Sequence, residues 1–255
     1  MSKQPIRLLL PALMALCLFS CKKQTEDYPT DQLAAYVPLK TGKYITYRLD
    51  STVFKSFGTV PEVHSYQEKH VVDSLLPDAL GRSSYRVFRF TRDTAGTGPW
   101  QPAGSYFVTP LRNTIEVTEN NLRVIKLTLP IQKDNTWKAN RYLPDEPMSA
   151  LYTFSNDLDM STWDYTYASV QDTIHLKNGV VNDVITVNGI DRSFNAPVMN
   201  ENSIGYKDYQ QDRYAKNIGL VYQEFIMWEY QPPHENVPVG QTTGFGIRRS
   251  MIDHN

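Results

Sequence analysis

The chain is nearly free of cysteine: its 255 residues include only Cys17 and Cys21, both close to the N-terminus. This excludes a disulfide framework and a thiolate metal site in the rest of the chain. An excess of charge of one sign is missing as well, since 26 basic residues face 27 acidic ones. Nucleic-acid-binding domains depend on a basic surface, so nucleic acid is not an expected partner.

Long helical patterns and long apolar runs are also lacking. The apolar stretch at residues 8–20 is shorter than the roughly 20 residues that a membrane-spanning helix needs. The chain is rich instead in aromatic residues, with 16 tyrosines, 10 phenylalanines and 4 tryptophans. Because aromatic and β-branched side chains suit the half-buried surface of a sheet, this composition predicts β-structure.

The first 20 residues have the parts of an export signal. Lys3 and Arg7 supply positive charge, and the apolar residues 8–20 follow. The sequence Leu18-Phe19-Ser20-Cys21 then resembles the lipobox of bacterial lipoproteins, in which a peptidase cuts before a cysteine that already carries diacylglycerol. The resemblance implies that Cys21 becomes a lipidated N-terminus anchored to a membrane. The alternative is an ordinary signal cleaved elsewhere, with Cys21 present by chance.

Residues 21–35 are expected to form a tether between the lipid and the domain, because residues 22–30 are polar and contain a proline. Residues 22–27 look like the charged segments that follow the cysteine in lipoproteins of Bacteroidota. This implies a lipid anchor in the outer membrane of a bacterial envelope. The acidic residues come only after two lysines, so the choice between the periplasmic and the surface face stays open.

The remaining residues, 36–255, are expected to form a single all-β domain. Apolar and polar residues alternate, or apolar runs end at turn residues, in eleven stretches. These are residues 43–54, 63–75, 85–92, 105–108, 114–118, 122–129, 165–177, 181–187, 206–214, 220–230 and 245–252. Residues 148–154 fit a short helix or an edge strand. The pattern predicts an antiparallel sandwich, barrel or half-barrel of roughly ten to twelve strands.

Two turns are predicted with particular clarity. Asn178-Gly179 joins two strand-like runs and is the strongest local hairpin signal in the chain. Asn120-Asn121 is a second tight turn, since asparagine tolerates a positive φ.

Three short pieces carry a further resemblance. They are residues 36–44, with Tyr47 and Asp50 beyond them, residues 214–221, and residues 252–255 at the end of the chain. Together they resemble uncharacterised envelope lipoproteins of Bacteroidota, whose domains begin with a Pro-Leu…Gly…Tyr strand after the tether. The resemblance implies location and fold class, and it transfers no active site.

No histidine or carboxylate pattern gives a convincing catalytic or metal site. His64 and His70 are six residues apart, which on a strand separates them by about 20 Å. Asp157 and Asp159 have the spacing of a calcium loop, but the glycine and the glutamate that the loop requires are missing. No catalytic residue, metal or cofactor is therefore predicted.

Trp163, Tyr165 and Tyr167 alternate and should share one face of a strand. They are candidate ligand-facing aromatics, because such a row can stack on sugar rings. Core or cross-strand packing is the favoured interpretation in an all-β protein.

The sequence thus favours a non-enzymatic envelope lipoprotein with a structural or partner-binding role. The alternative is a protein that binds an apolar ligand or a glycan, and its partner would then be lipid, glycan or another envelope protein. A hydrolase with a site assembled from distant residues such as Asp172 and His175 ranks last.

Overall fold

The computed structural model describes residues 31–255. The predicted export signal, Cys21 and the first part of the predicted tether lie outside these residues. No helix in the described part of the chain is long and apolar enough to cross a membrane.

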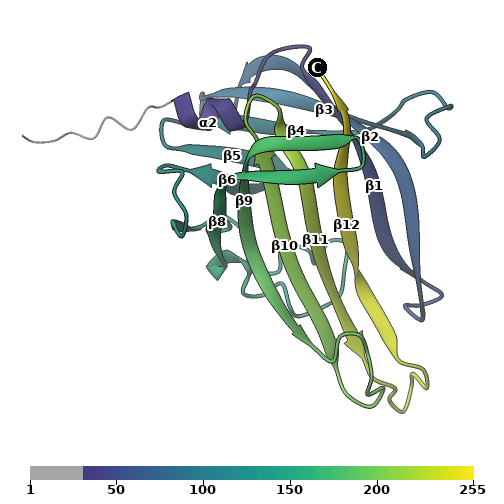
Figure 1. Cartoon of the computed structure of the whole chain (residues 1–255). Helices are drawn as coiled ribbons and strands as arrows, with labels where there is room; N and C mark the ends of the chain where they lie inside the picture. Colours follow the sequence, from purple (N-terminus) through teal and green to yellow (C-terminus); the bar gives the residue numbers. More distant parts are fainter. Residues whose placement is uncertain (1–30) are drawn as a thin grey trace, which may run out of the picture.

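Twelve antiparallel strands form one sheet in the order β6-β5-β4-β3-β2-β1-β12-β11-β10-β9-β8-β7. The sheet curls into a nearly closed barrel (Figure 1), so the all-β prediction is confirmed and the alternatives narrow to a barrel. The strands are β1 (Tyr44–Lys55), β2 (Val60–Pro77), β3 (Ser83–Asp93), β4 (Gln101–Pro110), β5 (Thr114–Glu119), β6 (Leu122–Thr128), β7 (Thr136–Lys138), β8 (Asp164–Leu176), β9 (Gly179–Phe194), β10 (Gly205–Ala215), β11 (Gly219–Gln231) and β12 (Gln241–His254).

Irregular pairing bends the sheet. Shifts in register interrupt several strand pairs, among them β2 with β3 between Val72 and Ser74, and β3 with β4 between Arg89 and Phe90. Such bulges increase the local twist and let a long antiparallel sheet curl. Gly244 allows the backbones of β11 and β12 to approach each other closely. It has a φ of +125°, and a Cβ there would clash with the carbonyl oxygen of Met227 on β11.

The two edge strands, β6 and β7, meet at a seam that closes the barrel. The backbone N–H of Ile125 donates to the carbonyl of Ala139 over 2.9 Å, and Trp137 Nε1 donates to the carbonyl of Ile125 over 2.9 Å. Farther along, the Tyr167 hydroxyl donates to the Thr128 carbonyl over 2.7 Å and accepts from the Thr128 N–H over 3.0 Å. Side chains thus replace most of the ladder of hydrogen bonds at this one junction.

Residues 139–163, here called the inner loop, lie against the inner face of the sheet. The ring of Tyr152 is 5.2 Å from that of Phe245, and Ser155 donates both its N–H and its hydroxyl to buried Glu229. The expected helix or edge strand at residues 148–154 is absent, and the segment is a series of turns. The N–H of Met148, just after Pro147, donates to the Asp157 carboxylate over 3.0 Å, so tertiary bonding holds this irregular backbone.

A short helix, α2 (Asp31–Tyr36), stands within the segment predicted as tether. Leu33 and Tyr36 are buried in the main core, and the N–H of Asn217 donates to the carbonyl of Ala35. The apolar spacing of these two residues gives the helix a face that packs on the barrel near the β10–β11 turn (Figure 1). The packed domain therefore includes residues from Leu33 onward, which the sequence pattern assigned to the tether.

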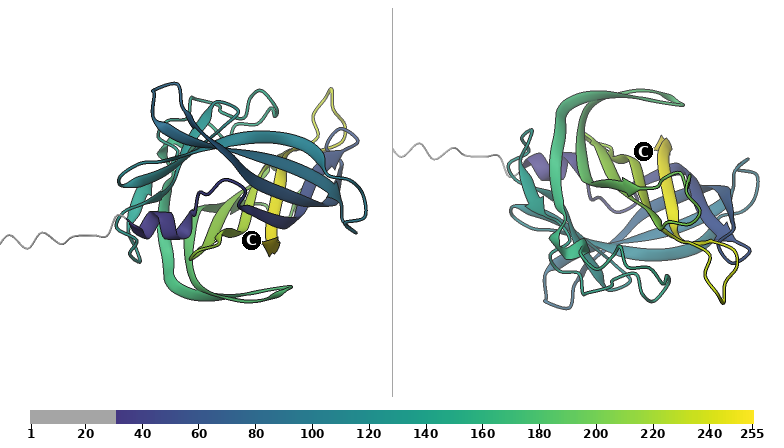
Figure 2. Two further views of the ribbon diagram at one scale, coloured as in Figure 1. Left: turned by 90° about the horizontal axis from the view of Figure 1, so that it is seen from above. Right: turned by 90° about the horizontal axis from the view of Figure 1, so that it is seen from below.

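The long β8–β9 hairpin bends into an arch over the ends of the neighbouring strands, and its tip reaches β12 (Figure 2). Apolar residues under it form a second, smaller core with the ends of neighbouring strands, including Ile174, Val184, Val221 and Met251. At the tip, the Asn178 amide donates to the carbonyl of Ile252 over 2.6 Å.

Candidate functional site

The barrel contains a cavity of about 780 Å³ that is open to solvent. This lies within the range of about 300 to 1,000 Å³ that is typical of small-molecule sites. Most of its wall is apolar and comes from alternate residues of successive strands, together with the inner loop and residues 37–39. Val72, Val87, Val108, Val117, Val124 and Phe245 are representative. Alternation places such side chains inside because successive residues of a strand point to opposite faces.

Cationic side chains outnumber carboxylates in the cavity wall. Lys43, Arg89, Lys126 and Arg249 face the cavity, whereas Glu119 is the one carboxylate among its lining residues. Other carboxylates lie behind this wall and pair with two of the four cations. The cavity is thus an apolar chamber with a positively biased polar region.

Glu68 is the centre of the buried polar network. Arg249 Nε donates to its carboxylate over 2.5 Å, and His70 Nε2 lies 3.1 Å from the same oxygen. Burial alone would raise the pKa of Glu68, but the hydrogen bond from His70 and the charge of Arg249 outweigh burial and hold that pKa far below its ordinary value. Glu68 is therefore ionised and neutralises Arg249.

His70 connects this network to the aromatic wall. Its Nδ1 lies 3.0 Å from the hydroxyl of Tyr106, and its ring packs edge-on against those of Tyr47 and Tyr106. Burial lowers the pKa of His70, with Glu68 opposing the shift in part, so the imidazole is neutral at pH 7. His70 Nδ1 and the Tyr106 hydroxyl share one proton, and the tautomer of the imidazole decides which of the two donates.

The remaining cations differ in how firmly they are held. Lys126 Nζ on β6 lies 2.9 Å from the carboxylate of buried Asp212 on β10. Arg89 pairs with Glu119 over 2.6 Å, and this carboxylate is 36% exposed. Arg89 Nε is buried and has no hydrogen-bond partner among residues 31–255. Asn140 Nδ2, also on the cavity wall, is likewise buried without a partner in the described part of the chain.

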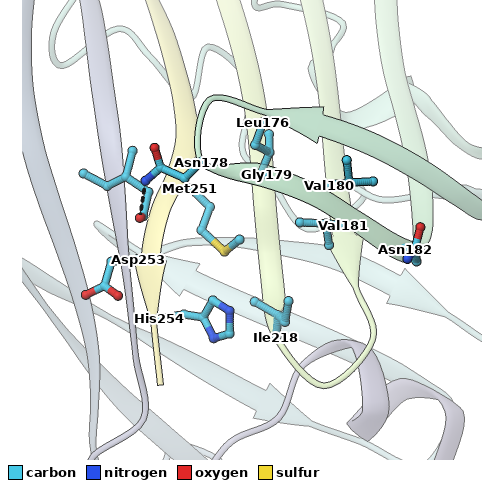
Figure 3. Close-up of a pocket in the computed structure, with 11 residues that line it drawn as sticks. Leu176, Asn178, Gly179, Val180, Val181, Asn182, Ile218, Met251, Asp253 and His254 are labelled. Carbon is cyan, nitrogen blue, oxygen red and sulfur yellow. Dashed lines mark hydrogen bonds between the residues drawn. The ribbon is translucent and has the colours of Figure 1, made fainter.

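A second cavity of about 460 Å³ lies under the tip of the β8–β9 hairpin (Figure 3). Its walls include Leu176, Val181, Ile218, Met251 and His254. It is smaller than the barrel cavity, and no charge network surrounds it comparable to the one around Glu68. The barrel cavity is therefore the candidate site.

Comparisons with known proteins add little to this geometry. No protein-family model and no curated protein matches the chain. Among solved structures, the chain is similar to a Bacteroides fragilis NCTC 9343 protein described as a "putative exported protein with YmcC-like fold". The two are 11% identical with a TM-score of 0.34, over 84% of this chain and 97% of that one. At this level the similarity carries no argument about function.

The three aromatic residues singled out in the sequence are all buried, and only Tyr165 lines the cavity. Its hydroxyl donates to Gln210, and Gly189 leaves room beside its ring, since a Cβ there would lie 3.1 Å from a ring carbon. Trp163 donates to the Asp159 carboxylate, and Tyr167 spans the seam. The aromatic row thus packs on the inside of the barrel.

The other sites considered in the sequence take up ordinary structural positions. Asp159 is bound by Arg192, which also reaches buried Asp208 over 2.7 Å, so these carboxylates fasten the inner loop to β9 and β10. Asp172 and His175 are both exposed on β8. Asp172 accepts hydrogen bonds from Ser169 and Thr173.

Sequence reasoning missed the residues that make the cavity polar, notably Glu68, Arg89 and Arg249. A weak signal exists for the two arginines, because each stands in a strand two residues from an apolar residue of the cavity wall. Val87 and Arg89 on β3, and Ile247 and Arg249 on β12, show this spacing. A charge on the buried face of a strand is costly unless paired, and its presence there marks a polar interior.

Proposed function

We propose that this protein is a cell-envelope lipoprotein, acylated at Cys21, whose barrel binds an apolar or amphipathic ligand. The observation that supports ligand binding is the cavity of about 780 Å³ with its mainly apolar wall. A mainly apolar cavity of this size is typical of small-molecule sites and favours binding over a purely structural role.

Cavity filling tests the binding proposal. In a soluble form of the chain that starts at Lys22 and keeps all twelve strands, Val117→Trp places an indole in the chamber. We expect at least a tenfold loss of affinity for a neutral naphthylamine dye that fluoresces in apolar surroundings. Val63→Trp is the matched control, because Val63 is 63% exposed on β2 and its replacement leaves the cavity unchanged.

Native mass spectrometry of the same protein, purified gently from a bacterial envelope, gives a second measurement. Bound mass that extracts as lipid supports the proposal. The proposal fails if the dye does not bind, or if both tryptophan variants bind it equally well. A structural or protein-partner role would then be favoured.

Lipidation at Cys21 is tested separately. The full chain is expected to fractionate with membranes and to carry an N-terminal mass of diacylglycerol plus acyl chains. Cys21→Ala should abolish the acyl mass and leave residues 1–20 uncut, because the peptidase requires the lipidated cysteine. A Cys21→Ala protein that is cut at the same position as the original chain would contradict the assignment.

A further inference from the structure

We infer that the ligand of the barrel cavity is an anionic amphiphile, an apolar body ending in a carboxylate or phosphate that pairs with Arg89. This inference rests on the proposed function and adds the chemical class of the ligand. It starts from the charges that the cavity presents, four cationic side chains against the single carboxylate of Glu119.

All four cations have partners in the structure. Arg249 is held by Glu68 and by the side-chain oxygen of Gln223, and Lys126 is held by Asp212. Neither can turn to a ligand without leaving a buried carboxylate unpaired. The Lys43 ammonium donates to the backbone carbonyls of Asn217 and Asn255, which are exposed residues.

Among the four cations, Arg89 alone has a buried donor that lacks a partner in the described residues. Its partner Glu119 is partly exposed and can be hydrated if it is displaced, which a buried carboxylate cannot. Arg89 Nε is buried without a partner in residues 31–255, and such a donor costs free energy until an acceptor reaches it. The nearest other carboxylate, that of Glu68, is 3.9 Å from Nη1 and serves Arg249 and His70.

Space beside the guanidinium is open on the neighbouring strand. Gly104 pairs with Arg89 in the β3–β4 register, and a Cβ at Gly104 would lie 3.2 Å from Arg89 Nη2. Gly104 is exposed and has a φ of +119°, which itself favours glycine, and the absence of a side chain there leaves the Nη2 side of the guanidinium uncovered.

The geometry of the guanidinium selects the head group. Nε and Nη2 of arginine form a fork that matches two oxygens of a carboxylate or phosphate. Glu119 now occupies Nη2, so an anion that takes both nitrogens displaces Glu119 and satisfies Nε in one step. Val87, two residues before Arg89, and Val117, two before Glu119, both line the cavity and lead from this head-group position into the apolar chamber.

The test compares ligands that share one oleoyl chain and differ only in the head. Oleate, oleoyl-lysophosphatidate, monooleoylglycerol and oleylammonium compete with the neutral dye in the Lys22–Asn255 protein. We expect one or both anions to bind at least tenfold more tightly than the neutral glyceride, and the cation to bind most weakly. Which anion is tighter distinguishes a fatty acid from a phosphate-headed lipid.

Variants assign the preference to Arg89. Arg89→Met should remove the advantage of the anions while dye binding is retained, and Arg89→Lys should restore part of it. Glu119→Gln should strengthen anion binding severalfold, because it removes the competing carboxylate. Arg248→Met is the matched control, since Arg248 is 57% exposed and pairs with Glu224 away from the cavity.

The outcomes separate the two proposals. If the dye binds in the cavity but all four oleoyl compounds compete equally, the anionic class is wrong and ligand binding stands. If the anions are preferred but Arg89→Met leaves that preference intact, the head group does not pair with Arg89 and the inference fails. If the dye does not bind, the proposed function itself fails.

Discussion

Replacing Glu68 by glutamine should lower the free energy of unfolding by about 3 to 5 kcal/mol, because it leaves the buried Arg249 guanidinium without a counter-charge. For a domain of this size the melting temperature should fall by roughly 6 to 20 °C. Chemical denaturation and calorimetry measure the two quantities. The hydrogen bond from Arg249 to Gln223 remains, but a neutral amide does not replace a carboxylate.

The matched control lies on the same strand. Glu62 forms an exposed ion pair with Lys55, so Glu62→Gln should cost less than about 1 kcal/mol. Combining Glu68→Gln with Arg249→Met removes both buried charges and should recover most of the loss, since replacing a whole buried pair by apolar groups is often neutral. A double variant as unstable as the single one would show that Glu68 acts through something other than charge.

The same carboxylate should make the protein sensitive to acid. Its pKa is far below the value of about 4.3 expected in the unfolded chain, so the unfolded state takes up a proton first as the pH falls. The contribution of Glu68 is fully present above about pH 5 and is lost progressively below about pH 4, by up to about 1.4 kcal/mol per pH unit. Glu68→Gln should therefore show a shallower decline of stability between pH 4 and pH 2. Equal slopes in the two proteins would contradict this reasoning.

Replacing Tyr167 by phenylalanine should weaken the seam of the barrel. The ring stays in the core, but the Thr128 N–H and carbonyl lose their shared partner, at a cost of about 1 to 3 kcal/mol. Hydrogen exchange should accelerate in residues 122–129 more than in the central strands β1 and β12. This local pattern is the signature of an opening edge rather than of general unfolding.

Tyr66→Phe serves as the control for the seam, because Tyr66 is 38% exposed on β2. Its effect should stay within about 0.5 kcal/mol. If Tyr167→Phe raised exchange uniformly along the chain, the seam would not be a separate weak point.

The strands were predictable because their signals are local. Alternation at residues 43–54 places β1 within one residue of Tyr44–Lys55, and the turn between β8 and β9 lies at Lys177-Asn178, one residue before the predicted Asn178-Gly179. The last strand is longer than the predicted 245–252, because residues such as Thr242 and Thr243 extend the pairing with β11 without an alternating pattern. The short β7 was missed, since three residues are too few to show a period.

The closure and the site depend on pairs that are far apart in sequence. Tyr167 meets Thr128 at the seam and Arg249 meets Glu68 over the intervening strand β1, and no local pattern specifies such partners. For the same reason the choice between sandwich and barrel stayed open. A charged residue in a strand also reads equally well as a solvent-facing position until the fold shows which face is inside.

The pairing of β1 with β12 constrains the order in which the chain can fold. Strands β1 to β6 form neighbouring hairpins that can pair as soon as they are synthesised, and so do β8 to β12 among themselves. The edge of β1 that does not pair with β2 remains unpaired until β12, the last strand, is available. An incomplete chain is therefore prone to aggregate through β1. Truncations that remove residues 241–254 should leave the protein permanently in that condition.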